Sequence, residues 1–67
     1  MSAEPVIIKQ YAGRRLYNPA AGSYLTIENL GAMVEDGEEF VVYDAKTGED
    51  ITPFVLKQII VERARHG

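Results

Sequence analysis

Residues 11–26 read YAGRRLYNPAAGSYLT, a composition typical of a β-hairpin that leads into a helix. Pro19 fixes the backbone at the first central position of a turn, Asn18 can hydrogen-bond its own backbone, and Gly22 tolerates a positive φ. Thr26 is suited to cap a following helix, because its side chain can accept a backbone N–H of the first turn. The paired strand residues on either side of the turn are then Leu16-Tyr17 and Tyr24-Leu25.

The same arrangement returns at an offset of about 26 residues, a period in the range of known structural repeats. The matched positions are Tyr17 with Tyr43, Asn18 with Asp44, Gly22 with Gly48, Leu25 with Ile51, and Thr26 with Thr52. The apolar positions that follow also correspond: Leu30, Met33 and Val34 with Leu56, Ile59 and Ile60. A chance similarity of two short segments is the alternative. The pattern predicts an α+β fold, a small single domain of two β-hairpin-helix repeats (ββα-ββα).

The 67-residue length limits the chain to one small domain, with residues 1–5 as a flexible tail and residues 6–64 as the folded part. A single core of this size barely offsets chain entropy, so we expect the domain to be oligomeric. The chain has no cysteine, which excludes disulfides and thiolate metal sites. It also has neither a long apolar run nor a secretion signal, and we therefore expect a cytoplasmic protein with no membrane contact.

The remaining elements follow from apolar patterning. A first strand runs from Val6 to Tyr11, and a helix after Thr26 ends at Gly37 in a left-handed cap. Phe40 to Tyr43 is an unbroken apolar strand, a pattern that indicates burial on both faces. Thr52-Pro53 predicts the start of a second helix, with Thr52 as its cap.

The second helix carries more apolar residues than the first. Where the first copy has polar residues, the second has Phe54, Val55 and Val61. These positions lie outside the apolar stripe formed by Leu56, Ile59 and Ile60. They therefore predict an oligomer interface. The alternative is that the monomer itself buries all the apolar residues of this helix.

Nothing in the sequence favours catalysis. The single histidine, His66, lies at the end of the chain, so no internal base is available for a Ser-His or Cys-His device. The carboxylates around Gly37 lack the ligand spacing of a calcium loop, and the glycines are too scattered for a phosphate loop. We therefore expect no enzyme, no metal and no cofactor.

One segment is a candidate site for an anion. The net charge is −3 and the pI is about 4.9, which argues against nucleic acid, but the basic residues are unevenly distributed. Arginine matches phosphate with a planar fork, and tyrosine both stacks and donates a hydrogen bond. The predicted DNA-binding residues are Lys9, Tyr11, Arg14, Arg15 and Tyr17.

Two observations bear on this site. The second copy has Phe40 and Val41 at the positions of Arg14 and Arg15, so the fold itself does not require arginine there. Strand alternation directs the two Arg side chains to opposite faces unless a bulge forms at Gly13. The alternative role of these arginines is a structural ion pair with local acids such as Asp44 or Glu49.

The chain resembles the N-terminal DNA-binding domain of the polyhydroxyalkanoate (PHB/PHA) accumulation regulators, which are bacterial repressors of storage-polymer genes. The resemblance covers Ile8 to Glu62, and its matching segments are Lys9 to Tyr11, Arg14 to Tyr17, Ser23 to Thr26 and Val42 to Thr52. It implies a transcriptional repressor that binds promoter DNA of granule (phasin and synthesis) genes. It also implies release from the DNA when the polymer or its oligomers accumulate.

Two functions therefore stay open at the level of sequence. The first is a DNA-binding module that works as a homo-oligomer on double-stranded promoter DNA. The second is a protein-protein oligomerisation or interaction module without direct DNA contact, which the low pI favours.

Overall fold

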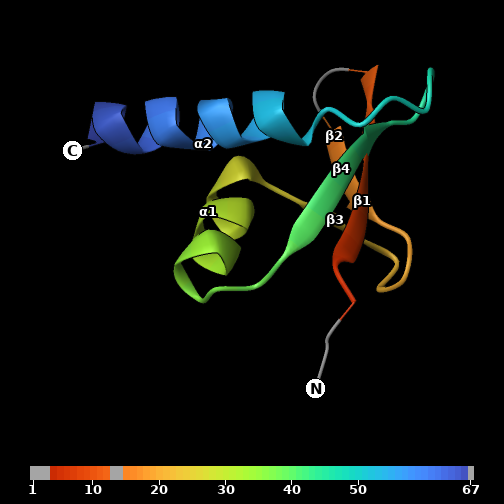
Figure 1. Cartoon of the computed structure of the whole chain (residues 1–67), viewed down its shortest axis with the longest axis horizontal. Helices are drawn as coiled ribbons and strands as arrows, with labels where there is room; N and C mark the ends of the chain where they lie inside the picture. Colours follow the sequence, from red (N-terminus) through yellow and green to blue (C-terminus); the bar gives the residue numbers. More distant parts are fainter. Residues whose placement is uncertain (1–3, 13–14, 67) are drawn as a thin grey trace.

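The computed structural model of the chain describes residues 4–12 and 15–66 (Figure 1). Its elements follow one another in the order β1 (Val6–Tyr11), β2 (Arg15–Asn18), β3 (Ser23–Leu25), α1 (Ile27–Glu35), β4 (Phe40–Asp44) and α2 (Thr52–His66). Of the predicted tail, only Glu4 and Pro5 lie in the described part, and both are exposed.

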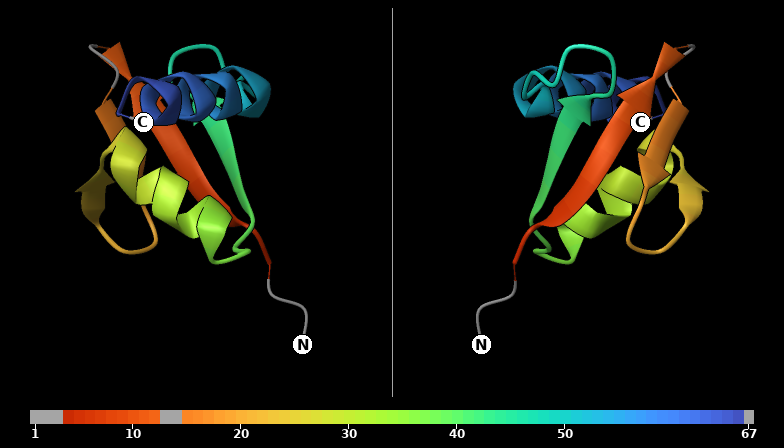
Figure 2. Two further views of the ribbon diagram at one scale, coloured as in Figure 1. Left: turned by 90° about the vertical axis from the view of Figure 1, so that its left-hand side faces the viewer. Right: turned by 90° about the vertical axis from the view of Figure 1, so that its right-hand side faces the viewer.

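The four strands form one mixed sheet in the order β3-β2-β1-β4. β1 pairs antiparallel with β2 and parallel with β4, and β2 pairs antiparallel with β3. The connection from β1 to its parallel neighbour β4 contains α1, as parallel strands need a crossover. Both helices lie on the same side of the sheet, and no described element covers the other side (Figure 2). The predicted α+β class is confirmed.

The predicted first hairpin is confirmed in detail. Leu16 pairs with Leu25 and Tyr17 with Tyr24, on either side of the expected turn. The Asn18 side chain accepts hydrogen bonds from the N–H groups of Ala20 and Ala21, at 3.0 and 3.2 Å. Gly22 has a φ of 68°, in the left-handed region that glycine enters without strain.

The second copy reproduces this turn but not the second strand. The Asp44 carboxylate accepts the N–H groups of Lys46 and Thr47, at 2.7 and 3.2 Å, and Gly48 has a φ of 78°. Beyond the turn, a single antiparallel bridge joins Tyr43 to Asp50. The ββα-ββα repeat is therefore not confirmed: the turn is duplicated, whereas β4 takes β1 as its strand partner.

The two helix starts differ as well. Thr26 caps α1 as predicted, since its hydroxyl accepts the N–H of Asn29 at 3.1 Å and the Asn29 side chain accepts the N–H of Thr26 at 2.9 Å. The prediction that Thr52 caps α2 is wrong, because Thr52 is the first helical residue. Its hydroxyl instead accepts the N–H of Val42 at 2.9 Å and donates to Asp50 at 2.6 Å, which ties the start of α2 to β4.

The hydrogen bonds at Asp50 predict acid sensitivity. The hydroxyl and the N–H of Thr52 lower the pKa of Asp50 from its ordinary value of 3.8. A carboxylate with a lowered folded-state pKa stabilises the fold above pH 3.8, and this contribution is lost as the pH falls through the folded-state pKa. We expect Asp50→Asn, which still accepts both hydrogen bonds, to lose less stability than the wild type between neutral pH and about pH 3.

Urea unfolding followed by circular dichroism at the two pH values measures this difference. Glu49→Gln is the matched control, because it removes a neighbouring exposed carboxylate to which no hydrogen bond is donated in the described structure. An equally steep loss of stability in wild type and Asp50→Asn would contradict the prediction.

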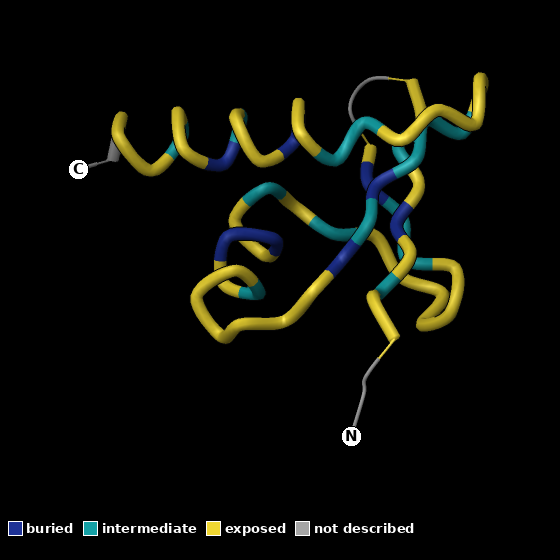
Figure 3. The backbone as a smooth tube through the Cα atoms, viewed as in Figure 1, coloured by how far each residue is buried: buried dark blue, intermediate teal, exposed yellow. Residues whose placement is uncertain are grey.

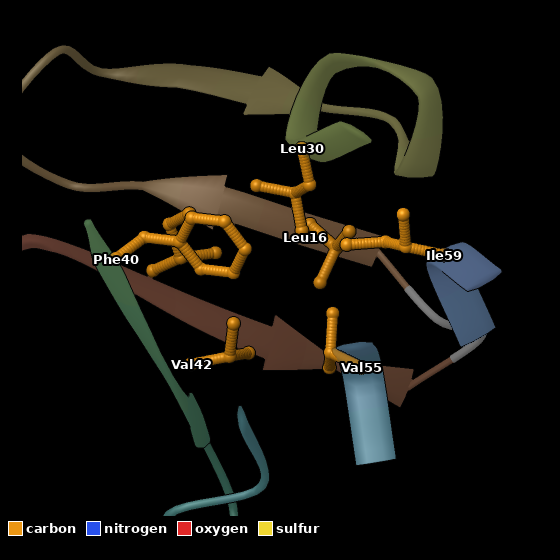
Figure 4. Close-up of a cluster of buried hydrophobic side chains, with 7 residues drawn as sticks. Leu16, Leu30, Phe40, Val42, Val55 and Ile59 are labelled. Atoms are coloured by element: carbon orange, nitrogen blue, oxygen red, sulfur yellow. The ribbon is translucent and has the colours of Figure 1, made fainter. Parts of the chain in front are cut away.

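The core lies between the sheet and the two helices (Figures 3 and 4). The buried side chains are Ile8, Leu16, Leu30, Phe40, Val42, Val55 and Ile59. Alternation along each strand sends every second residue to this side, so β1 buries Ile8 while Ile7 and Lys9 are exposed. β4 was predicted to be buried on both faces, and this is wrong: Phe40 and Val42 are buried, whereas Val41 and Tyr43 are half-buried on the uncovered side.

The side of α2 that faces the core differs from the side predicted from the sequence repeat. Val55 and Ile59 are buried, whereas Leu56 and Ile60, predicted as stripe residues, are exposed. The physical reason is the anchoring of Thr52 to β4. Residues three and seven positions after Thr52 lie on its side of the helix, and these are Val55 and Ile59.

The two helices also meet through an ion pair. Arg63 of α2 donates to the Glu35 carboxylate at the end of α1, at 2.7 Å. Gly31 leaves room for this contact, since a Cβ there would lie 3.1 Å from the Arg63 Nε. Both charged side chains are largely exposed, so the pair fixes the helix arrangement more than it adds stability. Gly37, with a φ of 75°, ends α1 in the predicted left-handed cap.

Candidate nucleic-acid interface

The uncovered side of the sheet, here called the open face, is defined by strand register. Cross-strand partners project to the same side of a sheet, so the pairs Lys9 with Tyr17, Tyr11 with Arg15, and Tyr17 with Tyr24 share one face. On the other flank of β1, Lys9 pairs with Tyr43 and Ile7 with Val41. The open face therefore consists of Ile7, Lys9, Tyr11, Arg15, Tyr17, Tyr24, Val41 and Tyr43.

All four tyrosines of the chain lie on the open face. The ring centroids of Tyr11 and Tyr17 are 6.3 Å apart at 71°, and those of Tyr17 and Tyr24 are 5.0 Å apart at 57°. These rings form a row across β1, β2 and β3. Such pairs stabilise a sheet, but Tyr24 remains 63% exposed, so much of the aromatic surface is available to a ligand.

The charged groups of the open face are both positive. Lys9 and Arg15 are exposed, and within residues 4–12 and 15–66 neither forms an ion pair. The alternative role of the arginines, a structural ion pair with Asp44 or Glu49, is not observed for Arg15, the one of the two that the structure describes. The Asp44 carboxylate accepts backbone N–H groups of its own turn instead.

Most of the acidic residues lie outside the strand positions of the open face. Seven of the ten sit on α1 and in the loops before β4 and α2: Glu28, Glu35, Asp36, Glu38, Glu39, Glu49 and Asp50. The other three, Glu4, Asp44 and Glu62, lie before β1, at the end of β4 and on α2. None of the eight strand positions of the open face is acidic. At the β4 edge, Asp50 lies opposite Tyr43 in the isolated bridge, and its carboxylate accepts two hydrogen bonds from Thr52. The fold thus separates a positive, aromatic sheet face from a negative remainder, an arrangement suited to an anion.

The structure brings together four of the five predicted DNA-binding residues: Lys9, Tyr11, Arg15 and Tyr17. Arg14 and the predicted bulge at Gly13 lie outside the described residues. Two of the four tyrosines of the open face, Tyr24 and Tyr43, were not predicted as site residues. Tyr24 could have been found from the sequence, since the predicted hairpin already placed it opposite Tyr17. Tyr43 could not, because the β1–β4 pairing has no local signal.

The predicted oligomer interface is only partly exposed. Phe54 is 71% and Val61 is 55% exposed, together with Leu56 and Ile60 on the same helix. Val55 is the correction: it is 1% exposed and belongs to the core, so it is not available to a partner. We call the exposed residues, Phe54, Leu56, Ile60 and Val61, the apolar surface of α2.

The described part of the chain shows neither a metal-binding cluster nor a membrane-spanning helix. There, no three side chains of the metal-binding types cluster closely enough to hold an ion, and neither helix is long and apolar enough to span a bilayer. One open groove of about 290 Å³ lies at the edge of β4, lined mainly by Pro5, Val34, Phe40 and Leu56 with Glu38 and Glu39 at its rim.

Comparison with known proteins gives consistent results. The chain is 38% identical over 61 residues to an uncharacterized protein of Allochromatium vinosum, covering 91% of this chain and 40% of that protein. It is also 38% identical over 61 residues to a protein of Thiocystis violacea named as an uncharacterized protein in the phbA 5′ region, covering 91% of this chain and 44% of that protein. The chain thus spans less than half the length of these relatives. No solved structure matches it.

The family match covers nearly the whole fold. The sequence profile described as the PHB/PHA accumulation regulator DNA-binding domain matches residues 7–67, which include every strand and helix from the second residue of β1 onward. The matched region contains the whole open face and the apolar surface of α2. The chain therefore belongs to the family of PHB/PHA accumulation regulator DNA-binding domains.

Proposed function

We propose that this domain is the DNA-binding part of a cytoplasmic transcriptional repressor that controls polyhydroxyalkanoate granule genes. Its partner is double-stranded promoter DNA, and it needs no cofactor. The observation that carries the proposal is the pair of exposed cations Lys9 and Arg15 on the open face of an acidic chain, neither of which forms an ion pair among the described residues. The name of the Thiocystis violacea relative places that protein beside a phb gene, which is consistent with a role in this pathway.

Charge on the open face provides the affinity in this proposal. A duplex presents closely spaced phosphates, and each cation that neutralises one releases a condensed counterion. A single domain with two described open-face cations makes few such contacts. We therefore propose that the protein acts as a homo-oligomer, in which several open faces contact one duplex.

The apolar surface of α2 is the proposed subunit interface. Phe54 and Val61 are one heptad apart, so they lie along the same side of the helix. Burying them on a second copy removes apolar area from water. Contact with the polymer or its oligomers is a further proposed use of exposed apolar groups, and it would link granule accumulation to release from DNA.

Titration of a promoter fragment from a granule-protein gene tests this function directly. We expect binding at low ionic strength, with a log affinity that falls by about 0.9 per decade of salt for each phosphate neutralised. Sedimentation velocity on the same samples should give a mass above the 7.4 kDa of one chain. Absence of binding at low salt would contradict DNA recognition, and a 7.4 kDa species at high micromolar protein would contradict the oligomer.

The second candidate is an interaction module that assembles subunits and makes no DNA contact. The exposure of Phe54, Ile60 and Val61, together with the pI of about 4.9, favours it. Salt separates the two candidates, since an apolar protein interface does not weaken steeply as ionic strength rises.

A further inference from the structure

We infer that the open face binds unpaired nucleobases, so that a single-stranded stretch of nucleic acid is a ligand of this domain alongside duplex DNA. The inference rests on the proposed nucleic-acid-binding function of the same face. It adds the chemical form of the ligand and the residues that hold it.

The shape of the open face is the first reason. A duplex major groove is about 12 Å wide and admits a helix or a two-stranded ribbon. Four strands spaced about 4.8 Å apart present a face too wide to enter that groove broadside. A duplex can therefore contact the cations of this face through its phosphates, but its stacked bases do not reach the tyrosine rings. Unpaired bases have no such restriction.

The aromatic geometry is the second reason. Neighbouring rings are tilted by 71° and 57°, so the tyrosines do not stack face to face on one another. Tyr11 and Tyr24, at the two ends of the row, are exposed. Aromatic side chains on an open sheet surface are a recurrent platform for splayed bases, and each base stacks regardless of its identity.

The positions of the cations are the third reason. Lys9 lies between Tyr17 and Tyr43 across the sheet, and Arg15 lies opposite Tyr11. Positive charge is thus interleaved with aromatic rings, as a chain of alternating bases and phosphates requires.

A second copy of the chain is the competing occupant of the open face. An isologous contact would place Lys9 and Arg15 against the same residues of the partner, or against its tyrosines. None of the eight strand positions of the open face is an acid, and Asp50 at the β4 edge already accepts two hydrogen bonds from Thr52. Burying unpaired like charges is costly, so charge complementarity favours a polyanion over a second open face.

Fluorescence anisotropy with a labelled oligothymidylate of about 12 nucleotides tests the inference, because this probe has no duplex structure and fits the footprint of a single-strand-binding module. We expect the 67-residue chain to bind it, and Tyr24→Ala to bind about tenfold more weakly through loss of one stacking contact. Tyr24→Phe keeps the ring and should retain the affinity. Val34→Ala, which truncates an exposed side chain of α1 outside both the open face and the apolar surface of α2, should bind as the wild type does.

The outcomes are distinct. Promoter duplex that binds while oligothymidylate does not would overturn the inference and leave the proposed function standing. Equal affinities for Tyr24→Ala and wild type would also overturn it, since the tyrosine row would then play no part. If neither nucleic acid binds and dilution shifts the tyrosine emission of an oligomer, the open face is a subunit interface. This readout is specific, since the chain has no tryptophan and all its tyrosines lie on that face.

Discussion

Leu30→Ala is expected to remove a large part of the folding stability of the protein. Leu30 is 0% exposed, and it is the residue through which α1 reaches the centre of the core (Figure 4). Truncating a buried leucine costs about 2–5 kcal/mol. A domain of this length has a total stability of roughly 3–10 kcal/mol, at about 0.05–0.15 kcal/mol per residue. The loss is therefore a large fraction of the total stability of the fold.

Urea titration followed by far-UV circular dichroism measures this loss. Val34→Ala is the matched control, since Val34 lies one turn further along the same helix and is 46% exposed. We expect its effect to stay below about 1 kcal/mol, as for most surface substitutions. Similar midpoints for Leu30→Ala and Val34→Ala would show that α1 does not contribute to the core in the way the structure indicates.

Charge reversal on the open face is expected to abolish DNA binding. In the double variant Lys9→Glu, Arg15→Glu, two cations that face phosphate become two anions that repel it. Both side chains are exposed and unpaired among the described residues, so the fold should be unchanged. We expect the affinity for promoter DNA at low salt to fall at least about a hundredfold, since two phosphate contacts are lost and two repulsions are gained.

The control for this variant carries the same change in net charge at a different place. Lys46→Glu, Arg65→Glu reverses two exposed cations outside the open face, in the turn after β4 and near the end of α2. If binding depends on the open face, the control should retain most of its affinity and an unchanged salt slope. Equal losses in the two double variants would indicate that only the net charge of the domain matters.

The local elements of this fold could be predicted from the sequence because their determinants are close along the chain. Asn18 bonds to N–H groups two and three residues away, Gly22 adopts the positive φ, and Thr26 caps its own helix. The segment with Lys9, Tyr11, Arg15 and Tyr17 could be identified as a candidate anion site for the same reason. Alternation within one predicted hairpin was enough to place Arg15 and Tyr17 on one face.

Only the tertiary structure decided how these elements meet. The pairing of β1 with β4 joins residues more than thirty positions apart, and it made Tyr43 and Val41 part of the open face. Likewise, the hydrogen bond from Val42 to Thr52 set the rotation of α2, which buried Val55 and exposed Leu56 and Ile60. The sequence by itself determined the turns, the cap of α1 and the charges of the candidate site, because short-range hydrogen bonds and backbone preferences act within a few residues. Strand order and helix rotation depend on which long-range contacts fill one shared core, and that choice is made only when the whole chain packs.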